Sequence, residues 1–131
     1  MSERGSGLER RVDYGVLSSF YGALLTRRQQ SMISLYCDED LGLAEIAKQL
    51  GVTRQCVNDT LNRTFDRLDQ LETALGLVKR FADQQKAIMA CRDLVDRAIR
   101  GDRAQASLLE ASRLLTDYLH EEETEAWPLK A

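Results

Sequence analysis

Apolar residues recur every three or four positions along most of this chain, which is the spacing of one face of an α-helix. The first such pattern predicts a helix from Leu8 to Leu25, and its expected buried residues are Leu8, Val12, Val16, Leu17, Phe20, Tyr21, Leu24 and Leu25. Thr26 is typical of a helix N-cap and predicts a second helix that ends near the acidic stretch DEDLG. Its expected buried residues are Met32, Ile33, Leu35 and Tyr36.

The stretch from Leu43 to Thr64, LAEIAKQLGVTRQCVNDTLNRT, predicts two helices joined by a tight turn. Gly51 allows the positive φ of the turn, Val52 fills the space beside it, and Thr53 caps the next helix. The residues expected to hold the two helices together are Leu43, Ile46, Ala47, Leu50, Val57 and Leu61. The pattern therefore predicts a helix-turn-helix motif.

The second helix of this motif continues beyond what the motif requires, because its apolar stripe extends through Phe65, Leu68, Leu71 and Leu75. Gly76 is either a break or a weak point in one very long helix, and the pattern fits both. The next segment is helical up to Gly101, and its expected inward-facing residues are Leu77, Val78, Phe81, Ile88, Cys91, Leu94, Val95, Ala98 and Ile99. A last helix is expected over 103–120, with the apolar residues Leu108, Leu109, Leu114, Leu115 and Leu119.

These elements predict an all-α protein in which a helix-turn-helix bundle is followed by long C-terminal helices. The composition agrees, because the 131 residues include one proline and no run of alternating β-branched residues. We expect a disordered N-terminus (1–7), a helix-turn-helix domain (8–75), a helical extension for oligomerisation or partner binding (76–120) and an acidic tail (121–131).

Several classes of protein are disfavoured by the residues that the chain carries. Its three cysteines, Cys37, Cys56 and Cys91, are far apart, which favours neither a disulfide framework nor a zinc site and suggests a reducing cytoplasm. No apolar run suits a signal peptide or a membrane helix. No phosphate loop, nucleophile elbow or set of spaced ligands indicates an enzyme, a metal or a cofactor, and His120 among glutamates is interpreted as part of a solvated end.

A family resemblance is carried by the run FYGALLTRRQQSMISLYCDEDLGLAEIAKQLGVTRQCVNDTLNRT and by the later ALGLVKRF. Both resemble the YlxM family of small bacterial helix-turn-helix proteins, over about residues 14–100. The first half is in turn similar to the promoter-reading C-terminal domain of bacterial sigma factors. The resemblance implies a regulator associated with the signal recognition particle pathway, because YlxM-like genes lie beside those for its GTPases.

The chain departs from that family's pattern at positions in or near the motif. Gly42 stands where a serine cap is usual, Cys56 where alanine is usual, and Asn58 where an aromatic residue or histidine is usual. Asn62 lies where lysine or arginine is common, which removes an expected phosphate contact. A redox-sensitive thiol is a second interpretation of Cys56, although packing is the simpler one.

If the second helix enters a major groove, its first turns face the base edges. The predicted DNA-binding residues are Thr53, Arg54, Gln55, Asn58, Asp59, Asn62 and Arg63. The predicted phosphate contacts are Arg27, Arg28, Lys48 and Arg67. Arginine pairs with guanine and glutamine or asparagine with adenine, whereas Asp59 could accept only from a cytosine amine.

Two hypotheses follow. In the first, the protein is a regulator that binds duplex DNA, or the RNA of the signal recognition particle, through Arg54 and Gln55. In the second, the motif is a scaffold, and the long helices form a homodimer or hold a protein partner such as a targeting GTPase. The formal charge of −3 favours the second hypothesis, and the intact VTRQ turn favours the first.

Overall fold

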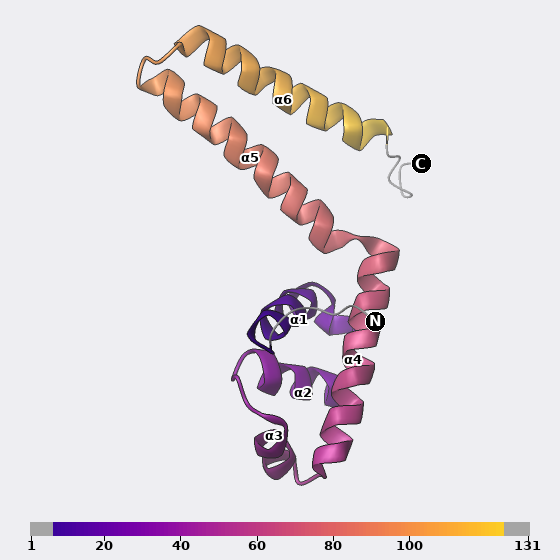
Figure 1. Cartoon of the computed structure of the whole chain (residues 1–131). Helices are drawn as coiled ribbons and strands as arrows, with labels where there is room; N and C mark the ends of the chain where they lie inside the picture. Colours follow the sequence, from indigo (N-terminus) through magenta and orange to yellow (C-terminus); the bar gives the residue numbers. More distant parts are fainter. Residues whose placement is uncertain (1–6, 125–131) are drawn as a thin grey trace. The chain divides into compact units, whose positions relative to one another are not determined.

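The computed structural model describes residues 7–124 of the chain, with side chains up to residue 120. This part confirms the all-α fold (Figure 1). Its helices are α1 (Gly7–Tyr21), α2 (Arg27–Cys37), α3 (Leu43–Leu50), α4 (Arg54–Leu75), α5 (Leu77–Ile99) and α6 (Ala104–Thr124), and a 3₁₀ turn, η1 (Gly22–Leu24), follows α1. The chain divides into unit 1 (Met1–Val78) and unit 2 (Lys79–Ala131), each of which is described by itself.

Both expected chain ends fall mainly outside the described residues, and each needs a correction where it does not. Gly7, which was assigned to the disordered N-terminus, is the first residue of α1. Helix α6 continues to Thr124, so the first four residues of the expected acidic tail (121–131) are helical. Glutamate is a good helix former, which explains why the helix does not stop at residue 120.

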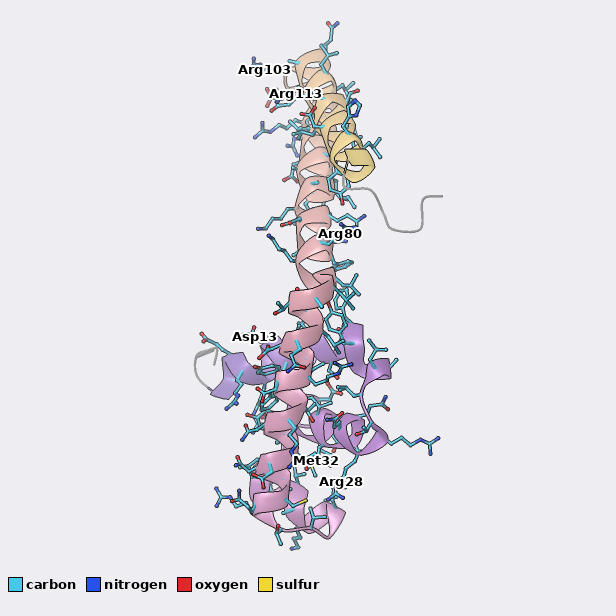
Figure 2. The ribbon with its side chains drawn as sticks, turned by 90° about the vertical axis from the view of Figure 1, so that its right-hand side faces the viewer. Asp13, Arg28, Met32, Arg80, Arg103 and Arg113 are labelled. Carbon is cyan, nitrogen blue, oxygen red and sulfur yellow. The ribbon has the colours of Figure 1, made fainter. Side chains whose placement is uncertain are left out.

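Unit 1 buries one continuous core between α1, α2 and α4, and α3 packs against the first half of α4 (Figure 1). All four residues predicted to be buried in α2 are buried, and Met32 among them is fully enclosed (Figure 2). Thr26 caps α2 as predicted: its hydroxyl accepts from the backbone N–H of Gln29, whose side chain accepts from the N–H of Thr26 in return. This capping box fixes the start of α2.

The face of α1 that packs on the core differs from the prediction. Leu8, Val12 and Val16 are exposed, whereas Tyr14 and Tyr21 are buried. Leu17 and Leu25 are buried as expected, Phe20 is half-buried, and Leu24 is exposed because the α-helix ends at Tyr21. The aromatic rings explain the difference: the ring of Tyr14 stacks on that of Phe65 at 4.2 Å between centroids, and its hydroxyl donates to Asp69 at 2.8 Å.

Arg11 joins α1 to the loop between α2 and α3. Its guanidinium donates to the carbonyl oxygens of Tyr36 and Leu41, the latter at 3.0 Å, and lies 3.9 Å from the centroid of the Tyr36 ring. It also pairs with the exposed carboxylate of Asp40 at 3.3 Å. Asp40 has a positive φ of 56°, so the loop turns sharply at that residue. Arg11 therefore fixes the segment that leads into α3.

Helix α4 ends at Leu75 because Gly76 adopts a left-handed conformation, with φ 61° and ψ 27°. This settles the question that the sequence left open at Gly76. The first N–H groups of α5 are satisfied by side chains of unit 1: Leu77 donates to the Tyr21 hydroxyl at 3.0 Å, and Val78 donates to Glu72 at 3.1 Å. Tyr21 itself donates to Glu72, so side chains of unit 1, rather than water, satisfy the N–H groups that follow the helix break at Gly76.

Unit 2 is a hairpin in which α5 and α6 run antiparallel, joined at Gly101 and Arg103, both with positive φ (Figure 1). Among its described side chains only Cys91, Ser107 and Ala111 are buried. The predicted inward-facing residues of α5 therefore need correction, because Phe81, Ile88, Val95 and Ile99 are exposed. Leu94 and Ala98 are half-buried, as are Leu77 and Val78 in unit 1.

Candidate nucleic-acid interface

The turn between α3 and α4 has the geometry that the sequence predicts. Gly51 is left-handed, with φ 68°, and Val52 donates to the carbonyl of Ala47 at 3.0 Å. The hydroxyl of Thr53 accepts from the N–H of Cys56 at 3.0 Å and so caps α4. The two helices are held by Ile46, Ala47, Val57 and Leu61, all of which are buried.

Two residues of the predicted contact between α3 and α4 are less enclosed than expected. Leu43 is half-buried, and Leu50 is 38% exposed. Leu50 is the last residue of α3, where the chain turns away at Gly51, so a side chain there has no facing helix to cover it. The packing therefore depends on Ile46 and Ala47, which face Val57 and Leu61.

The start of α4 presents polar side chains to solvent. Thr53, Arg54 and Gln55 are exposed in or next to the first turn. Further along the helix the exposed predicted residues are Asp59, Asn62 and Arg63, whereas Asn58 is half-buried. Gln55, Asp59 and Asn62 follow a spacing of four and three and so lie on one face. Asn58 lies closer to the core side, which corrects its placement on the same open face.

Two of the predicted base-reading residues bind each other. The side-chain amide of Gln55 donates to the carboxylate of Asp59 at 2.9 Å. One of the two amide hydrogens of Gln55 is thereby used, and a carboxylate is fixed in the middle of the exposed face. The i, i+4 spacing of the pair was visible in the sequence and could have revealed this contact. To read adenine with both its oxygen and nitrogen, Gln55 would have to leave Asp59.

The predicted phosphate contacts divide into two groups. Arg28, which is labelled in Figure 2, extends from α2 to the start of α4. Its guanidinium donates to the Cys56 sulfur, and the two atoms are 3.0 Å apart. Lys48 lies in the last turn of α3, just before Gly51. Arg63 and Arg67 lie nine and thirteen residues after Arg54, which places them roughly 14 and 20 Å further along the helix axis.

The contact between Arg28 and Cys56 leaves no signal in the sequence. Cys56 is half-buried and lies in the first turn of α4, and no pattern within either helix links it to α2. The contact brings a cation from α2 to the positively polarised end of α4, whose first turn contains no acidic residue. Arg28 and Arg54 are exposed at this end, where they suit an anionic partner such as a phosphate backbone. Arg27 is exposed at the start of α2.

No other kind of site is evident in the part of the chain that the structure describes. Among the side chains of residues 7–120, no cluster of three or more histidine, cysteine, aspartate or glutamate residues could hold a metal ion. Over the same residues, no helix is both long and apolar enough to cross a membrane. The start of α4 is therefore the candidate site on which the functional argument depends.

Comparison with known proteins gives a family and several relatives. The model of the family UPF0122, described as "Putative helix-turn-helix protein, YlxM / p13 like", matches residues 8–108. A UPF0122 protein of Desulforamulus reducens is 48% identical over 81 residues, covering 62% of this chain and 69% of the relative. UPF0122 proteins of Geobacillus kaustophilus and Bacillus licheniformis are 36% and 39% identical, covering 78% and 79% of this chain and 93% and 94% of those relatives.

Proposed function

Because this chain belongs to the UPF0122 family of helix-turn-helix proteins, we propose that it is a regulator that binds duplex DNA through the first turns of α4. The observation that carries the proposal is the arrangement of Arg28, Arg54 and Gln55 around a capped helix start that is held by a formed turn. The family resemblance extends the proposal to a cytoplasmic role linked to the signal recognition particle pathway.

In this proposal Thr53 and Arg54 enter the major groove with the start of α4. Arg54 pairs with a guanine, and a good bidentate pair of this kind contributes about 1–3 kcal/mol of discrimination. Asp59 accepts from a cytosine amine or holds Gln55 in place as it does in the free protein. The positive end of the helix and Arg28 contact the adjacent phosphates.

The electrostatics predict weak, salt-sensitive binding by one copy. The cations that the structure places at the turn and the start of α4 are Arg28, Lys48 and Arg54, and each neutralised phosphate contributes a slope of about −0.9 to the dependence of log K on log salt. Because the whole chain has a formal charge of −3, its overall field does not favour a polyanion. We therefore propose that a homodimer, which presents two such helices, is the DNA-binding form.

A second candidate is an interaction module that binds the particle's RNA or one of its GTPases. It is favoured by the acidic residues on α4, since Asp59 and Asp66 are both exposed there, and by the apolar side chains that unit 2 exposes. An RNA would be recognised by its shape and phosphates rather than by its base edges. A protein partner would use the exposed apolar side chains of unit 2.

The experiment that separates these candidates is fluorescence anisotropy of a labelled random-sequence duplex, titrated from low to physiological salt. Arg54→Ala should weaken binding and reduce the salt slope by about 1. Asp59→Asn should strengthen binding, because it removes a negative charge from the groove-facing surface. Arg97→Ala, which removes the same charge from the exposed surface of α5, is the matched control.

The outcomes are distinct. Opposite effects of Arg54→Ala and Asp59→Asn, with no effect of Arg97→Ala, support binding through α4. Absence of binding at low salt excludes the duplex proposal. If the protein binds the particle's RNA in the same assay, and Arg54→Ala weakens this binding no more than Arg97→Ala does, the interaction module is favoured.

A further inference from the structure

The two helices of unit 2 bury too little to hold each other together. Among the described side chains from residue 79 onward, only Cys91, Ser107 and Ala111 are buried, and all three are small. The Cys91 thiol lies 3.8 Å from the carbonyl oxygen of Ala111, so the helices approach closely at this point. Two helices of more than twenty residues each need far more buried apolar surface to offset the loss of chain entropy.

The buried and half-buried positions of the hairpin follow a regular repeat. On α5 they are Ala87, Cys91, Leu94 and Ala98, and on α6 they are Ala104, Ser107, Ala111, Leu114 and Tyr118. The spacings alternate between three and four, which is the pattern of a seam between two helices of a coiled coil or bundle. This seam is made mostly of small residues, and the larger apolar side chains lie beside it.

The larger side chains come one residue after seam positions. Ile88, Val95 and Ile99 follow Ala87, Leu94 and Ala98, and the same relation holds on α6 for Leu108, Leu115 and Leu119. One residue turns the direction of a side chain by about 100° around the helix axis. Because α5 and α6 run in opposite directions, this turn points both rows to the same side of the hairpin. The six residues therefore form one surface, here named the apolar face.

The apolar face is open to solvent. Its six side chains are between 39% and 78% exposed, and their exposed area is roughly 500 Å², comparable to the largest apolar patch of a typical monomer. Its neighbours on α6 are uncharged: Gln105 and Ser112. Arg92 on α5 is the one charged residue within the face. The charged residues of the hairpin gather on the opposite side, where Lys86, Asp93, Arg97, Glu110, Arg113 and Asp117 are exposed.

We propose that the apolar face binds the apolar face of a second copy of this chain, so that two hairpins form an antiparallel four-helix bundle. This assigns a surface to the homodimer proposed above and rests on that proposal, but not on DNA binding. Helices of such bundles carry a seam toward each of two neighbours, which is the double pattern seen here. The seam row faces the other helix of the same hairpin, and the apolar face meets the second copy.

The size and composition of the face fit self-association. A standard interface buries about 800 Å² on each partner, with an apolar, charge-depleted centre and a polar rim. The six apolar side chains supply the centre, and Gln105 and Ser112 supply uncharged polar groups at its edge. A two-fold interface needs only one patch that is complementary to itself, and two rows of aliphatic side chains that include a single charged residue, Arg92, satisfy this condition.

The extent of the family match also favours a second copy over a partner that the whole family shares. The match ends at residue 108, in the second turn of α6, so Leu115 and Leu119 lie beyond it. A partner recognised by family members in common would not require these residues. A second copy of this chain always carries Leu115 and Leu119, so it always supplies the whole apolar face.

The test is sedimentation velocity of the full chain over a range of concentrations, without nucleic acid. We expect the wild type to sediment at twice the chain mass. The double variant Val95→Glu with Leu115→Glu places charges in the centre of the apolar face and should raise the dissociation constant at least about 100-fold. Circular dichroism confirms that each variant keeps its helices.

The matched control is Met89→Glu with Leu109→Glu. These residues are 51% and 65% exposed, as much as or more than Val95 and Leu115, but they point away from the other helix of the hairpin and from the apolar face. The control should remain a dimer. A monomeric wild type, or equal weakening by both double variants, would overturn the proposal.

The same proteins separate this proposal from the proposed function. If the wild type is a dimer that does not bind DNA, the apolar face is supported and the groove-reading proposal fails. If the wild type is a monomer whose binding to a single half-site depends on Arg54, the reverse holds.

Discussion

Replacing Arg11 tests whether the contacts between α1 and the loop before α3 stabilise the helix-turn-helix unit. The side chain is only 19% exposed, donates to two backbone carbonyls and lies over the Tyr36 ring. Arg11→Ala removes all of these contacts and leaves the carbonyls of Tyr36 and Leu41 without their donor. Both hydrogen bonds are only partly buried, so water can replace part of what the carbonyls lose.

The magnitude follows from the separate contributions. Each charge-assisted hydrogen bond contributes about 1.5–3 kcal/mol when it is fully buried, and the cation–π contact about 0.5–2 kcal/mol. The ion pair with Asp40 contributes little, because that carboxylate is 77% exposed. Allowing for hydration of the freed carbonyls, we expect unit 1 to lose about 2–3 kcal/mol of unfolding free energy. This loss raises the equilibrium constant for the opening of unit 1 about 30- to 150-fold relative to the wild type.

Hydrogen exchange followed by mass spectrometry measures this opening separately in each unit. Peptides from α2 and α4 should exchange faster by that factor in Arg11→Ala, whereas peptides from α6 should be unchanged. Arg11→Lys should fall between, since a lysine keeps the charge but cannot stack on the ring and reach two carbonyls together. Arg27→Ala removes an exposed arginine at the start of α2 and serves as the control. If Arg11→Ala and Arg27→Ala exchange alike, the contacts of Arg11 carry no stability.

Three further predictions concern unit 1. Val57→Asp should abolish its helical circular dichroism, because Val57 is 0% exposed and the carboxylate would have no partner; an unchanged melting curve would contradict the packing of α4 on α3. Gly76→Ala should destabilise unit 1 by about 1 kcal/mol in urea titration, through its φ of 61°, since no atom obstructs the new methyl group. Burial raises the Cys37 pKa from 9.0 to about 11, so the unfolded chain loses this proton first. The unfolding free energy should therefore fall as pH rises from 9 to 11, and it should fall less steeply in Cys37→Ala. Burial also raises the Tyr21 pKa, so the wild type and Cys37→Ala share the part of the fall that is due to Tyr21.

The parts of the fold that could be predicted are those fixed by short-range chemistry. Thr26, Gly51 and Thr53 were identified from their residue types, because a cap or a left-handed turn needs few residues and those few are local. The exposed start of α4 followed from the turn, since the buried Val57 and Leu61 determine which side faces solvent. The contact of Arg28 with Cys56 could not be predicted, because it joins residues 28 positions apart across two helices.

The errors on α1 and α5 have one cause, which is that an apolar period does not say which of two adjacent rows will be covered. On α1 the apolar period predicts that the aliphatic row of Leu8, Val12 and Val16 is buried, but tyrosines pack on the core because their hydroxyls donate to carboxylates on α4. On α5 the large and the small residues were assigned together to one inward face. In the structure the small residues form the seam between α5 and α6, since only small side chains let two helices approach so closely. The row of large side chains remains exposed beside the seam, which is the arrangement expected of a helix with two neighbours of which one is a second copy.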